Sequence, residues 1–182
     1  IQAGRVKVDG KVVTQLGTLV HSKNVIEVDG VKLEKEDHVY YLLNKPRGVI
    51  TSTTDDKKRK TVVDLIETDK RIYPVGRLDY DTTGILLLTN DGNFSNYLMH
   101  PANEITKTYW AKIKGILKAD AIHALEQGVV IDGRKTQPAK VKLRKVDEKN
   151  HTCMVEITIH EGRNHQIKKM IQSVGFEVLK LK

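Results

Sequence analysis

The chain has 182 residues, 39% of them hydrophobic and 30% charged, which suffices for one domain with a buried core and part of another. Its formal net charge of +8 favours a polyanionic partner such as a nucleic acid, although a basic composition also serves solubility alone. The longest apolar run, at 39–43, is too short to cross a bilayer. The single cysteine excludes an internal disulfide and a zinc site built from several cysteines. We therefore expect a cytoplasmic protein with Cys153 packed in its core.

The N-terminal segment is predicted to form short hairpins. Residues 4–10 and 25–30 alternate apolar and polar positions, and each run ends in an Asp-Gly pair, which favours a tight turn between two strands. The segment 1–40 carries six Lys or Arg and six Asp or Glu, which cancel, so the net charge of +8 lies on residues 41–182. A charged stretch without periodicity, at 32–37, marks the predicted boundary between a first region, 1–38, and a second region, 39–182.

The second region is predicted to combine strands joined mostly by short turns with a few helices. We expect a buried strand at 39–43, a polar surface loop at 51–60, a short helix at 93–99, and alternating strands at 108–115, 139–146 and 152–159. Helices are expected at 119–127, ending at Gly128, and around 167–174, ending at Gly175. This order predicts an antiparallel α+β sheet. The strand at 139–146 has a basic solvent face formed by Lys140, Lys142 and Arg144, suited to gripping phosphates.

One aspartate, Asp79, lies next to Arg77 in a Thr/Gly-rich turn just before the apolar run 85–88. The pattern predicts a carboxylate held at the end of a buried strand, where a reactive group must sit still. Taken alone, such an aspartate is most often a turn cap or a structural ion pair. The pair Asp79 and Asp81 also matches a D-x-D pattern that can hold a divalent ion in glycosyl transfer, but no nucleotide-binding glycine loop accompanies it.

Two further positions gain meaning only beside Asp79. Lys168 follows Ile167 in the helix around 167–174 and lies about 100° around it, at the border of the apolar face. Tyr109 begins a predicted strand. Alone, these positions indicate an exposed lysine and a half-buried aromatic residue.

Four motifs occur in order: Asn44-Lys45-Pro46-Arg47-Gly48, Gly-Arg-Leu-Asp-x-x-Thr-x-Gly at 76–84, Lys-Thr-Tyr at 107–109, and Gly-Arg-Asn-His-Gln-Ile-Lys at 162–168. Together they resemble the pseudouridine synthase family, and specifically the branch that acts on ribosomal RNA and carries an N-terminal S4 RNA-binding domain. Within it, enzymes of the large ribosomal subunit are most similar, and a small-subunit enzyme is the alternative. The resemblance implies an α+β fold with a mostly antiparallel mixed sheet flanked by helices.

The resemblance also reaches the N-terminal region. Residues 1–10 and 26–30 resemble the second half of an S4 domain, whose pair of basic helices would precede them. A generic β-rich extension is the alternative interpretation. The family's chains usually continue beyond residue 182, so we expect a longer natural protein at both ends.

The resemblance implies a role for each matching residue. Asp79 corresponds to the catalytic carboxylate, Tyr109 to the residue that stacks on the target base, Ile167 to a pocket wall, and Lys168 to the ion-pair partner of the aspartate. The residues expected to bind RNA are Arg77, Lys45, Arg47, Arg163, Lys140, Lys142 and Arg144. No cofactor and no metal are expected, the partner is ribosomal RNA, and the protein is expected to act as a monomer.

The reaction that the resemblance implies breaks the bond between ribose and N1 of uracil and rejoins the ring through C5. One carboxylate can start it, as a nucleophile at the ribose or as a base that yields a glycal, and the sequence does not choose between them. The base must leave its stack first, and Tyr109 can offset that cost by stacking on it. Two rivals stay open at this point: a non-catalytic RNA-binding factor and a metal-dependent glycosyl-transfer enzyme.

Overall fold

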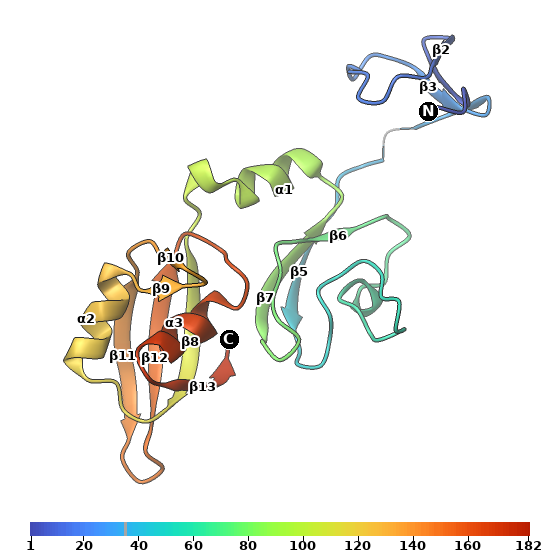
Figure 1. Cartoon of the computed structure of the whole chain (residues 1–182). Helices are drawn as coiled ribbons and strands as arrows, with labels where there is room; N and C mark the ends of the chain where they lie inside the picture. The colour runs from blue at the N-terminus through green and yellow to red at the C-terminus, as the bar shows by residue number, and fades with distance from the viewer. Residues whose placement is uncertain (35) are drawn as a thin grey trace. The chain divides into compact units, whose positions relative to one another are not determined.

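The computed structural model describes residues 1–34 and 36–182 and divides the chain into two compact units, Ile1–Asp37 and His38–Lys182 (Figure 1). The first unit is an antiparallel sheet in the order β2-β1-β3-β4, formed by β1 (Val6–Val8), β2 (Lys11–Val13), β3 (Ile26–Val28) and β4 (Val31–Lys32). The predicted hairpins are confirmed. In both turns the Asp-Gly pair has positive φ, 48° and 79° at Asp9-Gly10 and 52° and 80° at Asp29-Gly30, as two-residue hairpin turns require.

The second unit begins with a three-stranded antiparallel sheet in the order β5-β7-β6. Its strands are β5 (Tyr40–Lys45), β6 (Tyr73–Val75) and β7 (Gly84–Thr89), and a short 3₁₀ turn, η1 (Val63–Leu65), packs beside it. The strand predicted at 39–43 is present as β5, but it is buried on one face only. Leu42 points to the other face and is 71% exposed, as is Ile85 on β7 at 73%.

A four-stranded antiparallel sheet in the order β11-β12-β8-β13 forms the rest of the second unit. Its strands are β8 (Lys107–Lys114), β11 (Lys140–Asp147), β12 (Thr152–Ile159) and β13 (Glu177–Leu181). Its helices are α2 (Ala119–Gln127) and α3 (Gln166–Ser173), which share one apolar core with one face of the sheet. The strands predicted at 108–115, 139–146 and 152–159 and both helices are confirmed, and Cys153 is buried in this core.

The remaining elements connect these two sheets or decorate them. Helix α1 (Gly92–Met99) follows β7, as predicted, and leads through the 3₁₀ turn η2 (Pro101–Asn103) to β8. The hairpin of β9 (Val130–Ile131) and β10 (Arg134–Lys135), and the strand β13, were not anticipated. The whole confirms the predicted α+β class with mostly antiparallel sheets. Within residues 1–34 and 36–182, no helix combines the length and apolar character needed to span a membrane.

The two sheets meet at the start of β7 and the end of β13. Thr83 N–H donates to the carbonyl oxygen of Leu181 at 3.1 Å, and Gly84 opens β7 with a φ of 129°, which L side chains rarely adopt. The loop 76–83, between β6 and β7, therefore lies where the three-stranded sheet joins the four-stranded one. It is the loop that carries Asp79.

Candidate active site

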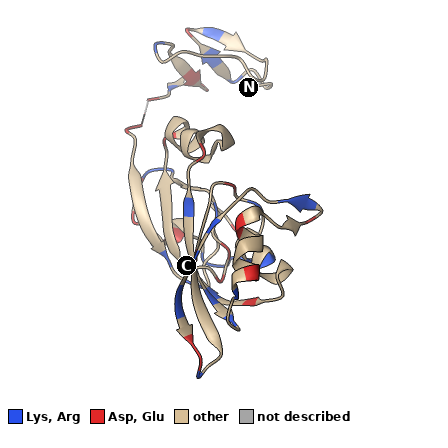
Figure 2. Cartoon of the chain, turned by 90° about the vertical axis from the view of Figure 1, so that its left-hand side faces the viewer, with Lys and Arg blue, Asp and Glu red and all other residues tan. Residues whose placement is uncertain are grey.

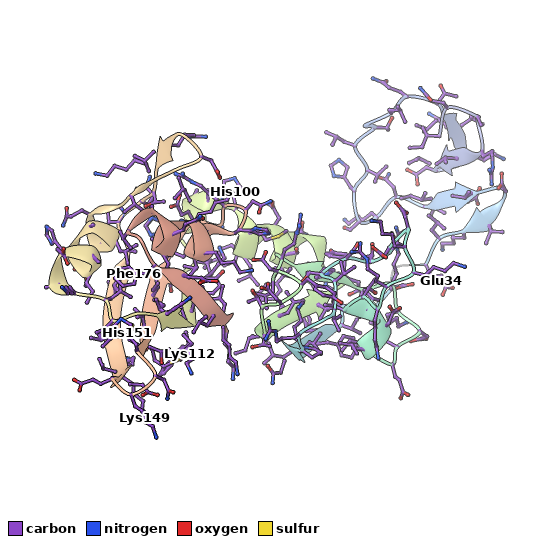
Figure 3. All side chains as sticks on the ribbon, turned by 60° about the horizontal axis from the view of Figure 1, so that its bottom comes forward. Glu34, His100, Lys112, Lys149, His151 and Phe176 are labelled. Carbon is purple, nitrogen blue, oxygen red and sulfur yellow. The ribbon has the colours of Figure 1, made fainter. Side chains whose placement is uncertain are left out.

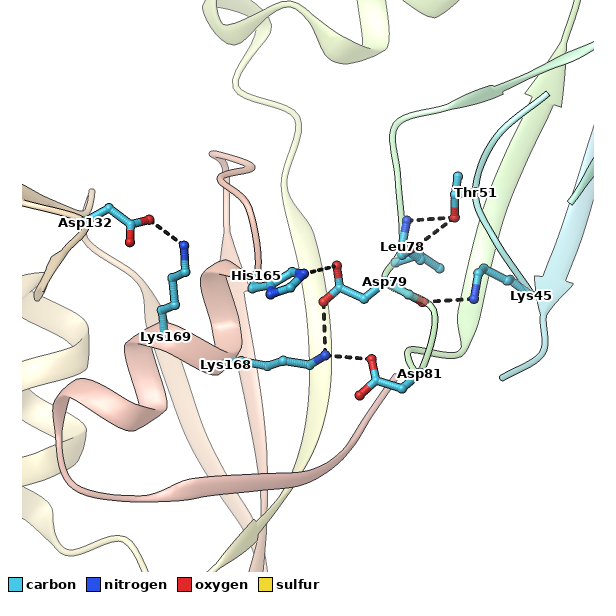
Figure 4. Close-up of polar contacts among 9 residues, drawn as sticks. All are labelled: Lys45, Thr51, Leu78, Asp79, Asp81, Asp132, His165, Lys168 and Lys169. Carbon is cyan, nitrogen blue, oxygen red and sulfur yellow. Dashed lines mark hydrogen bonds and ion pairs between the residues drawn. The ribbon is translucent and has the colours of Figure 1, made fainter. Parts of the chain in front are cut away.

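The backbone around Asp79 is anchored at successive residues (Figure 4). The hydroxyl of Thr51 donates to the carbonyl of Leu78 at 2.7 Å and accepts from the Leu78 N–H at 3.2 Å. Gly48 N–H donates to the carbonyl of Tyr80 at 2.8 Å, and Thr82 N–H closes a turn on the carbonyl of Asp79 at 3.0 Å. Each of these bonds fixes the main chain on one side of Asp79 or the other.

Lys45 completes this anchoring from the end of β5. Its side chain is 0% exposed, and its ammonium donates to the carbonyl oxygens of Pro46 (3.1 Å), Asp79 (3.0 Å) and Thr82 (3.0 Å). Burial lowers the pKa of Lys45, while the negative charges of Asp81 and Asp79 oppose that shift. The prediction that Lys45 binds RNA was wrong, because all three donors of a buried ammonium are already used inside the protein.

Two side chains of the α3 segment meet the Asp79 carboxylate. Lys168 Nζ lies 3.2 Å from Asp79 Oδ2, and His165 Nε2 lies 3.5 Å from Asp79 Oδ1. Lys168 Nζ also lies 2.6 Å from Asp81 Oδ1, so one ammonium is shared by two carboxylates (Figure 4). Burial acts to lower the pKa of Lys168, but its contacts with Asp81 and Asp79 raise it above the ordinary lysine value. Lys168 is therefore a cation at neutral pH.

Asp81 is the second acid of this group. The hydrogen bond from Lys168 lowers the pKa of Asp81, burial opposes that shift, and the charges of Lys168 and Arg47 add to the lowering. Arg47, predicted to bind RNA, is exposed beside the loop and is close enough to act on Asp81. The sequence indicates Asp81 only as a possible metal ligand and gives His165 no role of its own. A pairing across 87 positions leaves no local signal.

The segment before α3 is held by a network of its own. The buried side chain of Gln166 accepts from the Arg163 N–H at 2.8 Å and donates to Glu161 at 2.5 Å. The Arg163 guanidinium donates to the carbonyl oxygens of Arg134 (3.0 Å) and Lys135 (2.6 Å) in the β9–β10 hairpin and pairs with Glu161. Arg163 was predicted to contact RNA, but its guanidinium holds the protein's own backbone. These contacts tie the segment that carries His165 and Lys168 to the β9–β10 hairpin.

Asp79, Tyr109 and Ile167 line one pocket, where the three-stranded sheet, β8 and α3 meet. Its lining residues are Arg77, Leu78, Asp79, Thr82, Tyr109, Ile159, Gly162, Arg163, His165, Gln166, Ile167 and Leu181. Burial, and then the charge of Asp79, raise the pKa of Tyr109, so the phenol is neutral at physiological pH. The pocket thus presents an acid, a cation near it, and a neutral aromatic ring.

The other residues predicted to bind RNA are divided between two places. Arg77 is exposed at the rim of the pocket. Lys140, Lys142 and Arg144 lie on β11, an edge strand of the four-stranded sheet, and are not among the pocket residues. In the part of the chain that the structure describes, no group of three or more His, Cys, Asp or Glu residues is arranged to hold a metal ion.

Comparisons with known proteins agree with this geometry. The chain matches the family model described as RNA pseudouridylate synthase over residues 39–173. It is 55% identical to ribosomal large subunit pseudouridine synthase B of Bacillus subtilis (strain 168), over 100% of this chain and 75% of that protein. It is 36% identical to the dual-specificity RNA pseudouridine synthase RluF of Escherichia coli (strain K12), over 100% of this chain and 61% of that protein. A crystal structure of a pseudouridylate synthase superimposes with a TM-score of 0.70 at 28% identity, covering 99% of this chain and 76% of that one.

Proposed function

The chain belongs to the RNA pseudouridylate synthase family, and from this premise we propose that it converts one particular uridine of large-subunit ribosomal RNA to pseudouridine. Isomerisation of uridine in ribosomal RNA is the activity that the relatives support, since their names include a ribosomal large subunit enzyme and a dual-specificity enzyme. The choice of subunit follows the relative with 55% identity. We further propose that the protein acts as a monomer in the cytoplasm, where its RNA would be found.

One observation carries the catalytic part of this proposal: Asp79 is fixed by its backbone and faces the Lys168 ammonium at 3.2 Å inside a pocket that Tyr109 also lines. The reaction needs no oxidant and no energy source. The bond from ribose C1′ to uracil N1 breaks, a bond from C1′ to C5 forms, and the C5 proton is finally replaced by one on N1. An ionised carboxylate at C1′ or C2′ can begin this as nucleophile or base, and the Lys168 ammonium lies beside it.

The remaining pocket residues suit an extracted pyrimidine. Tyr109 is proposed to stack on the base, an interaction worth about 1–3 kcal/mol, which offsets the few kcal/mol needed to unstack it. Ile167 is buried and would form an apolar wall of the pocket. Arg77, at the rim, and Arg47, beside Asp81, are proposed to contact phosphates of the flanking RNA. Lys140, Lys142 and Arg144 would contact RNA outside the pocket.

We propose that the first unit is the later part of an S4-like RNA-binding domain. Its four short antiparallel strands with Asp-Gly turns support this assignment, as do the residues at 1–10 and 26–30 that resemble the S4 pattern. A generic β-rich extension predicts no contribution to RNA affinity. Deleting residues 1–37 and measuring the affinity for ribosomal RNA separates the two interpretations.

The test of the catalytic assignment is Asp79→Asn, with Asp132→Asn as a matched control. Asp132 pairs with Lys169, the residue after Lys168, at 2.6 Å, so the control also removes one carboxylate from a lysine of α3 (Figure 4). We expect Asp79→Asn to bind ribosomal RNA and form no pseudouridine, whereas Asp132→Asn forms it normally. Product from Asp79→Asn equal to that of the unchanged protein would rule out the assignment and leave an RNA-binding factor.

The position of the target uridine needs a separate experiment. Pseudouridines are mapped in ribosomal RNA from cells with and without the gene, and the deleted strain is complemented with the unchanged or the Asp79→Asn protein. We expect one site in the large subunit to be lost and to return only with the unchanged protein. A lost site in the small subunit would correct the choice of subunit and leave the activity in place.

A further inference from the structure

The four-stranded sheet has a second face that the catalytic pocket does not use. Tyr109 and Trp110 are successive residues of β8, so their side chains point to opposite faces of the sheet. The face of Tyr109 is covered by α2 and α3 and contains the pocket. Trp110 lies on the other face and is 44% exposed. This places a large aromatic ring on the face of the sheet that the helices leave open.

The register of the sheet shows which side chains share the face of Trp110. Directly paired residues of an antiparallel sheet lie on the same face, and Trp110 pairs with Glu156, which pairs with Lys142. The same rule places seven lysines on this face: Lys112, Lys114, Lys140, Lys142, Lys145, Lys180 and Lys182. Only three acids join them, Asp147, Glu156 and Glu177. Figure 2 marks Lys and Arg in blue along these strands, and Figure 3 labels Lys112.

Arg144 contacts both Glu156 and the Trp110 ring. It stands at an irregularity of β11 between Leu143 and Lys145, where the pairing with β12 shifts by one residue. Its guanidinium donates to Glu156 Oε2 from Nε at 3.0 Å and from Nη2 at 2.7 Å, and its Cζ lies 5.9 Å from the centre of the Trp110 ring. Glu156, the acid nearest the ring, is thus already neutralised by Arg144. Among the described residues, Lys114 is the lysine of this face that forms an ion pair, with Glu177 at 3.9 Å, so the other lysines are available to an external partner.

We propose that this face binds an unpaired stretch of RNA, with one base stacked on Trp110 and the flanking phosphates held by the lysines on either side. An exposed ring among cations on an open sheet is the arrangement that binds single-stranded nucleic acid, because a base can stack on the ring only when it is not already paired and stacked. Because Trp110 and Tyr109 face opposite ways, this stretch is distinct from the nucleotide that enters the pocket. The inference rests on the proposed function only in taking RNA as the ligand.

Trp110 is the one tryptophan of the chain, so its fluorescence reports on this face alone. The Asp79→Asn protein is titrated with a single-stranded oligouridylate, with duplex RNA and with heparin. We expect the oligouridylate to quench the tryptophan, since stacking brings a base against the ring. Heparin carries charge without bases, and duplex RNA keeps its bases stacked, so neither should quench it. Equal quenching by all three, or none by the oligouridylate at saturation, would overturn the proposal.

Substitutions test the same face through labelled RNA. Trp110→Ala should weaken binding of the oligouridylate about tenfold, whereas Trp110→Tyr, which keeps a ring, should restore most of the affinity. Lys142→Ala should reduce the slope of log affinity against log salt by about 0.7, the value for one lost phosphate contact on a single strand. The matched control is Lys118→Ala, an exposed lysine before α2 on the helical side, which should leave both quantities unchanged. Equal effects from Lys118→Ala and Lys142→Ala would indicate charge alone and overturn the proposal.

The outcome separates this inference from the proposed function. If Trp110→Ala forms pseudouridine normally and loses no RNA affinity, the proposal that the Trp110 face binds RNA is wrong, and the proposed enzymatic activity stands. Suppose instead that the unchanged protein forms no pseudouridine, yet RNA quenches Trp110 and Trp110→Ala weakens RNA binding. RNA binding by this face would then be supported, and the proposed activity would be contradicted.

Discussion

The two sheets of the second unit hold their parts of the pocket by different means. The three-stranded sheet fixes Asp79 through main-chain bonds and the buried ammonium of Lys45. The four-stranded sheet supplies Lys168 through the side chain of a helical residue, 27% exposed, with four rotatable bonds between the backbone and its charge. The acid is thus held through its main chain, whereas its cation is placed by a long side chain that contacts Asp79 and Asp81 together.

The largest effect, on the free energy of unfolding, is expected from Lys45, because its ammonium holds the main chain around Asp79. Lys45→Met keeps a similar length but removes the ammonium donor from the carbonyls of Pro46 and Thr82 and leaves the Asp79 carbonyl with the Thr82 N–H alone. An unsatisfied buried acceptor costs about 1–3 kcal/mol, so we expect the free energy of unfolding to fall by about 3 kcal/mol or more. Urea unfolding followed by Trp110 fluorescence measures this in the second unit, where Trp110 lies. Lys60→Met, at an exposed loop lysine, is the control and should change it by less than about 0.5 kcal/mol. Equal midpoints for both variants would show that Lys45 is not the anchor.

Lys168→Met leaves the carboxylates of Asp79 and Asp81 without the cation that they share. We expect kcat to fall about 10²-fold, the usual effect of losing one group that stabilises charge at a reacting centre. Lys168→Arg keeps the charge and should recover part of the rate, and Lys169→Met, which breaks only the pair with Asp132, is the control. A rate in Lys168→Met equal to that in Lys169→Met would show that the ion pair has no catalytic role.

Much of this architecture could be predicted because its signals are local. The Asp-Gly turns, the helix at 119–127 with Gly128 after it, and the alternating strand at 152–159 each follow from spacing over a few residues, and the structure agrees with them. Resemblance, which draws on motifs spread along the chain, predicted the family. The short strands of the β9–β10 hairpin have two residues each, too few to show a period.

The errors have a common physical cause, since they concern what lies across space. In the sequence, Lys45 resembles an exposed lysine that could bind RNA. Two of the three carbonyl oxygens that accept from its ammonium belong to Asp79 and Thr82, which are far from it along the chain. The run at 39–43 looks buried throughout because its apolar residues are continuous, yet the sheet covers one face only. The pairing of Asp81 with Lys168 could not be predicted from either segment alone.

A smaller effect is expected from Asp81→Asn, which removes the competitor for Lys168. Because the lysine then pairs with Asp79 alone, we expect kcat to change no more than about threefold, far less than for Lys168→Met. The hydrogen bond from Lys168 lowers the pKa of Asp81 below 3.8, so its contribution to stability is present above that value and is lost as pH falls through the lower one. With the carboxylate 49% exposed, solvent screening limits this to below about 1 kcal/mol. Unfolding at pH 7 and at low pH should therefore show a difference from the unchanged protein only at pH 7. A loss of rate as large as that of Lys168→Met would mean that Asp81 acts in the reaction itself.

The smallest effect is expected in the loop 51–60, which also carries Thr51. The side chain of Arg59 and its backbone N–H donate to Asp55 and lower the pKa of that carboxyl from 3.8 to about 2. The folded state therefore holds the Asp55 carboxylate ionised where the unfolded chain would protonate it, and the stabilisation is lost as pH falls from about 3.8 to about 2. Asp55→Asn should make unfolding less dependent on pH in that window and leave pseudouridine formation unchanged at pH 7. Asp56→Asn, an exposed neighbour, is the control. A lower rate of isomerisation in Asp55→Asn would contradict this expectation. It would mean that the Asp55–Arg59 part of the loop, like Thr51, helps to hold Asp79 in place.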